Sequence, residues 1–320
     1  MKAGERLIFL RNPPGRDEHI NDFLDGWYRA MHDAGVREVQ LADWPGRPPM
    51  ATALSRLLPQ RPLPWARTMA LTPMSWASDR DIFPAGFLHR IVPWIYDCWP
   101  ANWDRWEALL RRHRVRLAFF SSRQAAHEFE RRLPDVSCRW VPEAVDPGRY
   151  DPSRSLRSRT IDVVELGRRS ESIHRRLEPA LRDRGLRHEF QVAGAPRMYP
   201  TQRALGEALA QARVLVCLPK AVTHPQAAGG VETATHRYFE GMASGCVLVG
   251  RCPSELRELW GFDPVIAIEP EAPERTVLSV IERLGDHQEL VDRNLRRLRE
   301  VGTWTHRAAA MLREIAALPG

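Results

Sequence analysis

The sequence predicts an α/β protein with two domains, each built on a parallel β-sheet, and with the two sheets facing each other across a cleft. Short apolar runs alternate with helix-sized amphipathic segments along the chain, a pattern typical of strand–helix–strand units. The alternation stops near residue 142 and restarts near residue 161. The length of 320 residues is enough for two domains that each bury a core.

The first predicted domain, residues 1–150, contains six apolar runs of strand length. They are 7–10, 37–42, 67–71, 90–96, 116–120 and 138–141. After the fifth run, Ser121 and Gln124 have the spacing of a capping box, and apolar residues follow at helical spacing. We therefore expect a helix between the last two strands.

The second predicted domain, residues 151–320, repeats the pattern after a linker. The stretch "VPEAVDPGRYDPSRS" contains three prolines and a glycine and little periodicity, which is typical of a linker. Five strand-like runs follow, at 161–166, 189–194, 213–219, 246–250 and 265–269. The final stretch, "TWTHRAAAMLREIAAL", predicts an amphipathic helix that can pack back on the first domain.

The composition, 43% apolar and 27% charged, is ordinary for a soluble globular protein. No stretch approaches the roughly 20 apolar residues of a membrane span, and the N-terminus becomes charged too early for a signal peptide. We therefore expect a cytoplasmic protein. The five cysteines form no C-x-x-C pair, and no histidine cluster has ligand spacing, which argues for reduced thiols and against a structural zinc.

The net charge of +7 and the pI of about 9.6 are compatible with nucleic-acid binding. However, the only lysines are Lys2 and Lys220, so the positive charge is arginine spread along the whole chain. We therefore expect no nucleic-acid partner. A basic surface serves acidic substrates such as nucleotide diphosphates equally well, and peripheral contact with a membrane surface stays open.

The segment "GGVETATHRYFEGMASGCVLVG", residues 229–250, places two carboxylates in a loop–helix–strand unit. In open α/β sheets, ligands bind beyond the carboxyl ends of the strands. Glycines before a helix let backbone N–H groups approach an anion, and Glu240, within the helix, can accept hydrogen bonds from ribose hydroxyls. Alternatively, Glu232 and Glu240 are charges favoured by the helix dipole or by solvent. The residues alone leave both interpretations open.

Four motifs in order resemble those of retaining GT-B glycosyltransferases of the E-x7-E type. "VVELGRR" is similar to their "VGR" strand end, "RWVPEAVDPGRY" to their "IPNGVD" linker, and "ALAQARVLVCLP" to their "LYAxADVFVLPS". Glu232–x7–Glu240 followed by "GMASGCVLVG" resembles the E-x7-E segment and its continuation. The resemblance covers about residues 116–260 and implies the GT-B fold, with two Rossmann-like domains.

The resemblance also implies roles for individual residues. Glu240 would bind the ribose of a nucleotide-sugar donor, Glu232 would contact the transferred sugar as a catalytic residue, and Arg168 would contact the diphosphate. Further donor-binding candidates in the glycine-containing loop are Gly230, Thr233 and Thr235. Cations and helix dipoles stabilise the leaving diphosphate in such enzymes, so no metal and no other cofactor is expected.

The chain departs from this family at three places. The lysine expected five residues after Arg168 is Ile173, so His174 or Arg175 would supply the second positive charge. The glycine expected three residues after Glu232 is Thr235. "RNPPGRDEH" replaces the glycine-rich N-terminal loop. The identity of the sugar and of the acceptor is therefore left open.

Two further acidic features belong to the first domain. Asp79 and Asp81, in "SDRD", match the D-x-D that holds a metal in the other major glycosyltransferase fold, but no apolar strand flanks them, so we disfavour a metal site there. Asp97 follows "RIVPWIY", at the end of a buried strand. It is either an acceptor-side acid–base or binding residue, or the cap of the next helix.

We therefore expect a metal-independent glycosyltransferase with the donor in the second domain and the acceptor in the first. The acceptor would be a small molecule, a glycan or a lipid-linked acceptor. The alternatives are a non-catalytic GT-B-like protein, a nucleic-acid-binding protein, and a nucleotide-sugar epimerase of the same fold.

Overall fold

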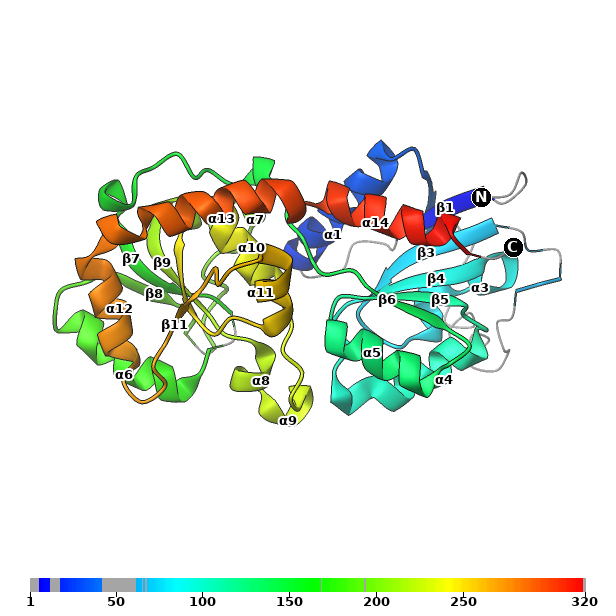
Figure 1. Ribbon diagram of the computed structural model, residues 1–320, viewed down its shortest axis with the longest axis horizontal. Coiled ribbons are helices and arrows are strands. Elements are labelled where there is room, and N and C mark those ends of the chain that lie inside the picture. Colours follow the sequence, from blue (N-terminus) through cyan, green and yellow to red (C-terminus); the bar gives the residue numbers. More distant parts are fainter. Residues whose placement is uncertain are drawn as a thin grey trace.

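The computed structural model describes residues 6–11, 18–41, 62–64, 66, 68–167, 169–192 and 194–318, and it has two halves, each with its own parallel sheet (Figure 1). The strands are β1 (Arg6–Arg11), β2 (Arg37–Gln40), β3 (Thr68–Met74), β4 (Arg90–Ile95), β5 (Leu117–Phe120), β6 (Ser137–Trp140), β7 (Ile161–Glu165), β8 (His188–Phe190), β9 (Ala212–Cys217), β10 (Val247–Gly250) and β11 (Ile266–Ala267). The helices are α1 (Glu18–Asp33), α3 (Ala85–Leu88), α4 (Trp103–Arg112), α5 (Arg123–Arg132), α6 (Glu171–Arg182), α7 (Gln202–Gln211), α8 (Lys220–Thr223), α9 (Pro225–Ala228), α10 (His236–Ala243), α11 (Ser254–Trp260), α12 (Pro273–Glu282), α13 (Gln288–Val301) and α14 (Trp304–Ala316). The predicted α/β class with two parallel sheets is confirmed.

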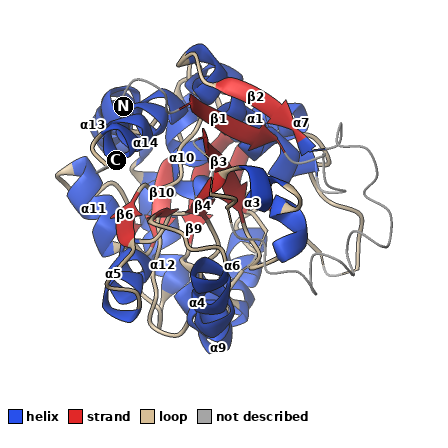
Figure 2. Ribbon diagram, turned by 90° about the vertical axis from the view of Figure 1, so that its right-hand side faces the viewer, coloured by secondary structure: helices blue, strands red, loops and turns tan. Residues whose placement is uncertain are grey.

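The first sheet has the strand order β2-β1-β3-β4-β5-β6, and its described pairs are parallel. Because side chains alternate between the faces of a strand, Ile8 and Leu10 join one core while Phe9 joins the other. Helices α4 and α5 cover the first face, and α1 and α14 cover the second (Figure 2).

The last helix, α14, packs on the first half although it follows the second half in sequence. Trp304 and Met311 belong to the same buried cluster as Phe9. Helix α1 comes so close that a Cβ atom on Gly26 would lie 2.5 Å from the Trp304 ring. Larger residues at position 26 are therefore excluded without displacement of α14.

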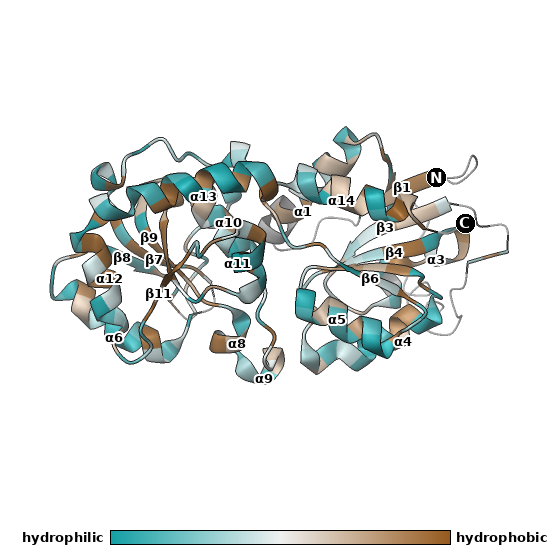
Figure 3. Cartoon of the chain, viewed as in Figure 1, coloured by the Kyte–Doolittle hydropathy of each residue, from teal (hydrophilic) through white to brown (hydrophobic). Residues whose placement is uncertain are grey.

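The second sheet has the strand order β11-β10-β9-β7-β8, again with parallel pairs. Helices α6 and α12 cover the face that carries Val163 and Val214, and α7, α10 and α13 cover the face that carries Val164 and Leu215. Apolar residues are concentrated in the strands, and polar residues lie on the outer faces of the helices (Figure 3). This order places the carboxyl ends of β7 and β9 side by side, and the segment after β7 lies next to α10.

The helix predicted after β5 is present as α5, but its predicted cap is wrong by one residue. Ser122, not Ser121, is the N-cap, and its hydroxyl accepts the Ala125 N–H at 3.4 Å. Gln124 therefore does not close a capping box, and its side chain reaches the second half instead.

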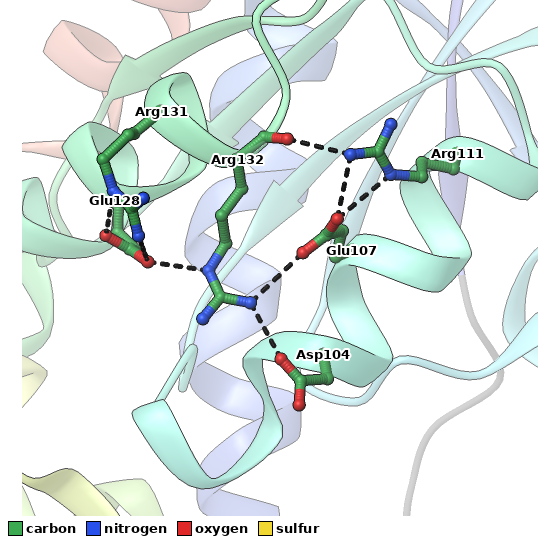
Figure 4. Close-up of polar contacts among 6 residues, drawn as sticks. All are labelled: Asp104, Glu107, Arg111, Glu128, Arg131 and Arg132. Atoms are coloured by element: carbon green, nitrogen blue, oxygen red, sulfur yellow. Dashed lines mark hydrogen bonds and ion pairs between the residues drawn. The ribbon is translucent and has the colours of Figure 1, made fainter.

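An ion-pair network joins α4 to α5 on the outside of the first half (Figure 4). The Arg132 guanidinium donates to Asp104 at 2.8 Å, Glu107 at 3.1 Å and Glu128 at 2.7 Å. These side chains are partly exposed, so the network stabilises the helix pair only modestly.

Among the described residues, no helix combines the length and the apolar character that crossing a bilayer requires.

Candidate functional site

The loop between β9 and α10 meets the first half of the chain. Helices α8 and α9 lie in this loop, and Ala228 and Val231 pack on Trp99 of the first half. Gly229 has a φ of +52°, and a Cβ atom there would lie 3.3 Å from the Pro100 ring. Glycine is favoured at this position by both the left-handed backbone and the close approach.

Glu240 is buried in the middle of α10, so it is not the solvated surface charge that the sequence left open. Its carboxylate accepts hydrogen bonds from Arg237 Nη1 at 2.7 Å and from the Tyr150 hydroxyl at 3.1 Å. His236 Nε2 lies 3.4 Å from the same carboxylate, and Gln202 donates to the Tyr150 hydroxyl. The carboxylate is thereby held in one orientation by groups from three segments.

Glu143, a buried residue of the linker, is part of this site although the sequence analysis did not single it out. Its Oε2 accepts the His236 backbone N–H at 2.6 Å, at the first turn of α10. Burial, reinforced by the negative charges of Asp97, Glu255 and Glu240 and opposed by the bond from His236, raises the pKa of Glu143 to about 8. The signal that could have revealed it is its place in "VPEAVD", where the motif "IPNGVD", which this segment resembles, has an uncharged asparagine.

Glu232 lies at the other end of the E-x7-E segment, in the loop before α10. Its carboxylate pairs with Arg251 Nη2 at 2.6 Å, and its backbone N–H donates to Gln124 Oε1 at 2.8 Å. The Gln124 amide also donates to the Gly230 carbonyl at 3.3 Å. Gln124 thus fixes the glycine-containing loop of the second half from α5 of the first half.

Thr233 and Thr235 follow Glu232 and have different environments. Thr233 is buried, and its hydroxyl donates to Glu255 Oε1 at 2.8 Å, which also accepts the Ala234 N–H at 2.7 Å. The Thr233 side chain therefore serves this internal contact. Thr235 is the N-cap residue of α10, and its side chain makes no capping hydrogen bond.

Asp97 lies at the carboxyl end of β4 and has a φ of +58°. Its Oδ1 accepts the Trp99 Nε1–H at 3.0 Å, and its carbonyl accepts a hydrogen bond from Asn102 at 3.4 Å. It therefore shapes the turn that follows β4. It is also close enough to Glu143 to raise that carboxyl's pKa, which brings it to the edge of the candidate site.

The end of β7 borders α10. A Cβ atom on Gly167, which has a φ of +66°, would lie 3.7 Å from Arg237 Nη2. A pocket at this edge is lined by Glu165, Leu166, Arg169, Val216 and Leu218. Arg169 is a cation that the sequence analysis did not single out, whereas the predicted Arg168 lies outside the described residues.

The two residues proposed as substitutes for the missing lysine point in different directions from α6. Arg175 is exposed. His174 is buried, its Nδ1 lies 2.5 Å from Glu165 Oε2, and its ring contacts Phe190. His188 Nε2 lies 3.2 Å from the same Glu165 oxygen. The structure thus places His174 in a Glu–His–His cluster rather than toward α10.

The D-x-D residues are remote from this site. The Asp79 carboxylate accepts hydrogen bonds from Arg112 and from Nε2 of the buried His113, the latter at 2.7 Å. Among the described residues, the His, Cys, Asp and Glu side chains that lie close enough together to hold a metal ion are Glu165, His174 and His188. Asp79 and Asp81 are not part of this group.

These features define a GT-B fold, in which two Rossmann-like halves meet and the loop before α10 lies at their junction. The solved structures that the chain resembles include glycosyltransferases. They include a glycosyltransferase from Rickettsia africae (TM-score 0.59, 8% identity, 99% of this chain and 100% of that chain covered). HepE from Anabaena, solved with UDP and glucose, has a TM-score of 0.61 at 11% identity, and the match covers 98% of this chain and 100% of HepE.

Sucrose-phosphate synthase from Thermosynechococcus elongatus has a TM-score of 0.63 at 13% identity and covers 97% of this chain and 98% of that one. The sequence matches no protein-family model and no curated protein. At such identities, the likeness establishes the shared fold.

Proposed function

We propose that this chain is a retaining glycosyltransferase that moves a sugar from a nucleotide diphosphate sugar to an acceptor nucleophile. The observation that carries the proposal is the buried Glu240 carboxylate, which Arg237 and Tyr150 orient beside the carboxyl ends of β7 and β9. Ligands of open α/β sheets bind at this edge. A buried carboxylate with fixed orientation suits the two vicinal hydroxyls of a ribose.

In this proposal the second half holds the donor and the first half the acceptor. Glu232 would contact the transferred sugar, and Arg168 and Arg169 would bind the diphosphate. The negative charge that develops on the leaving diphosphate is stabilised by these cations and backbone dipoles, so the reaction needs no metal. HepE structures contain UDP and UDP-glucose, which makes UDP-glucose the first donor to test.

The decisive experiment is a thermal-shift and hydrolysis screen of uridine, guanosine, adenosine and thymidine diphosphate sugars. A ligand that binds only the folded state raises the melting temperature. We expect one nucleotide family to do so in the parent and to lose its effect in Glu240→Gln, while Glu282→Gln, an exposed residue on α12, behaves as the parent. Binding to nucleic acid that weakens with salt, without any nucleotide-sugar response, would contradict the proposal. If the product is an epimerised donor that forms without an acceptor, the protein is an epimerase rather than a glycosyltransferase.

A further inference from the structure

Glu165, His174 and His188 come together in the second half, from three different elements. Glu165 ends β7, His174 lies in the first turns of α6, and His188 begins the edge strand β8. One ligand atom from each lies within 4.8 Å of the others. The side chains are 2%, 10% and 5% exposed. Because the residues are 9 and 14 positions apart, their sequence spacing gave no sign of a metal site.

The hydrogen bonds of this cluster are incomplete. Within the described part of the chain, Glu165 Oε1 and both ring nitrogens of His188 are buried without a hydrogen-bond partner. His188 Nε2 lies 3.2 Å from Glu165 Oε2, but the pair does not meet the geometry of a hydrogen bond. Buried polar atoms without partners are rare in folded proteins, and a bound ion is one of the groups that can satisfy them.

We infer that Glu165, His174 and His188 bind a divalent transition-metal ion of the Zn²⁺ class, with water as a fourth ligand. Two imidazoles and one carboxylate are ligands that Zn²⁺ accepts, whereas Mg²⁺ and Ca²⁺ prefer oxygen alone. Metal–ligand distances of about 2.0–2.1 Å at tetrahedral angles separate neighbouring ligand atoms by roughly 3.4 Å. The 3.2 Å between His188 Nε2 and Glu165 Oε2 is close to that value.

The 2.5 Å between His174 Nδ1 and Glu165 Oε2 is the length of a shared-proton contact and would open by roughly 1 Å around an ion. The rival state is therefore a metal-free triad in which a proton takes the place of the ion. That state leaves His188 Nε2 with the 3.2 Å contact to Glu165 Oε2 but without a hydrogen bond, whereas an ion would bind this nitrogen directly.

The ion would join β7, α6 and β8. Strand β8 has three residues and lies at the edge of the sheet, so it gains a second attachment besides its pairing with β7. The site does not depend on the proposed glycosyl transfer, because its evidence is the ligand geometry and the buried polar atoms without hydrogen bonds.

The test uses untagged full-length protein, stripped with a chelator and then dialysed against zinc. After gel filtration, elemental analysis should find one zinc per chain, and the melting temperature of stripped protein should rise with zinc concentration. Co²⁺ in place of Zn²⁺ should give the visible absorption of a four-coordinate site. His174→Gln and His188→Gln should weaken zinc binding more than about tenfold, as loss of even an outer contact does, while His127→Gln, an exposed residue of α5, should not.

Retention of no zinc by the parent, or equal zinc affinity in the parent and in folded His188→Gln, would overturn the inference. If circular dichroism shows that both variants are unfolded, the measurements on the parent protein still test the inference. In that case, the metal-free triad is supported if zinc does not change the melting temperature of the parent and if added Co²⁺ shows only the spectrum of the hexaaquo ion.

Discussion

Glu255 of α11 accepts the backbone N–H of Arg123 through Oε2 at 2.8 Å, so a carboxylate of the second half caps the first turn of a helix in the first half. Its other oxygen accepts the Thr233 hydroxyl and the Ala234 N–H. Burial raises the pKa of Glu255, while these hydrogen bonds oppose the rise. One buried side chain therefore connects the two halves to the loop before α10.

Replacement of Glu255 by alanine should loosen this junction. The change leaves the backbone N–H groups of Arg123 and Ala234 without their acceptor, and each loss costs about 1–3 kcal/mol. The Thr233 hydroxyl keeps only its longer contact with the Ser121 carbonyl, at 3.4 Å. We expect a loss of roughly 3 kcal/mol in the free energy of unfolding and faster amide hydrogen exchange at Arg123 and Ala234, measured by mass spectrometry. Glu258→Ala is the matched control, because Glu258 contacts Arg123 from an exposed position and should change stability by less than about 1 kcal/mol. Equal effects of the two variants would contradict the bridging role.

Glu143 predicts a pH dependence of stability. Its pKa is about 8 in the folded chain and about 4.3 when unfolded, so between these values the folded state binds more protons. Stability contributed by the protonated carboxyl is therefore complete below about pH 4 and is lost as the pH rises toward 8. Glu143→Gln keeps an acceptor for the His236 N–H and removes the titration.

The melting temperature of Glu143→Gln should accordingly fall less than that of the parent between about pH 5 and pH 8, with the variant more stable at about pH 8 by a few kcal/mol. Glu282→Gln should follow the parent curve. Parallel curves for Glu143→Gln and the parent would show that this carboxyl is ionised in the fold at neutral pH. Glu255, Glu240 and Asp97 act on the same carboxyl, so their variants should shift its titration.

The fold was predictable from the sequence because it depends on repeated local patterns. Strand runs such as 161–166 and the stripe of Ile173, Leu177 and Leu181 determine which faces are buried, and four ordered motifs indicated GT-B. The site was predictable only in part. Glu240 lies within a motif, whereas the contacts of Glu143 and Glu255 arise from tertiary packing between segments 93 and 132 residues apart.

The same limit explains His174. Its spacing from Arg168 suggested a diphosphate contact, but the helical turn directs its ring toward Glu165 and Phe190. Glu165 lies in "VVELGRR", but the partner His188 is on strand β8, 14 residues after His174, so no single motif predicted the cluster. Sequence spacing within one helix predicts which residues share a face of that helix. It does not predict which side chains of a neighbouring strand that face contacts.

Asp97→Asn should separate acceptor chemistry from donor binding. Asparagine tolerates the left-handed backbone of position 97, and its amide oxygen can still accept the Trp99 Nε1–H, so the variant removes the charge and keeps the turn. We expect the transfer rate to fall about 10²-fold or more if Asp97 assists deprotonation of the acceptor, with donor affinity nearly unchanged. Steady-state transfer and calorimetric titration measure the two quantities. Unchanged transfer would leave Asp97 with the structural role that its bond to Trp99 already shows.

Turnover should survive removal of divalent ions. If Arg168, Arg169 and backbone dipoles neutralise the leaving diphosphate, transfer in EDTA should match transfer with Mg²⁺ or Mn²⁺. Asp79→Asn should likewise leave turnover unchanged, since Asp79 is bonded to His113 and Arg112. Activity that is lost in EDTA and restored by Mg²⁺ or Mn²⁺ would return Asp79 and Asp81 to consideration. Restoration by Zn²⁺ alone would point to the Glu165 cluster instead.

The two glutamates of the E-x7-E segment should be distinguishable by ligand. Glu240 is proposed to bind the ribose, which UDP and an intact UDP-sugar both carry, so Glu240→Gln should weaken both. A hydrogen bond to a charged group contributes about 1.5–3 kcal/mol, which corresponds to roughly 10- to 150-fold in affinity. Glu232 is proposed to contact the transferred sugar, so Glu232→Gln should weaken only the intact donor, or lower its turnover.

Calorimetric titration of both variants with both ligands measures this difference. Glu282→Gln is the control for loss of a carboxylate elsewhere in the second half, and Arg251→Gln separates the loss of the Glu232 ion pair from the loss of the sugar contact. If Arg251→Gln reproduces Glu232→Gln, the effect of Glu232 comes from loop geometry rather than from contact with the sugar. If both glutamate variants bind both ligands as the parent does, the buried Glu240 carboxylate serves its contacts within the protein, such as those with Arg237 and Tyr150, and the donor site must lie elsewhere.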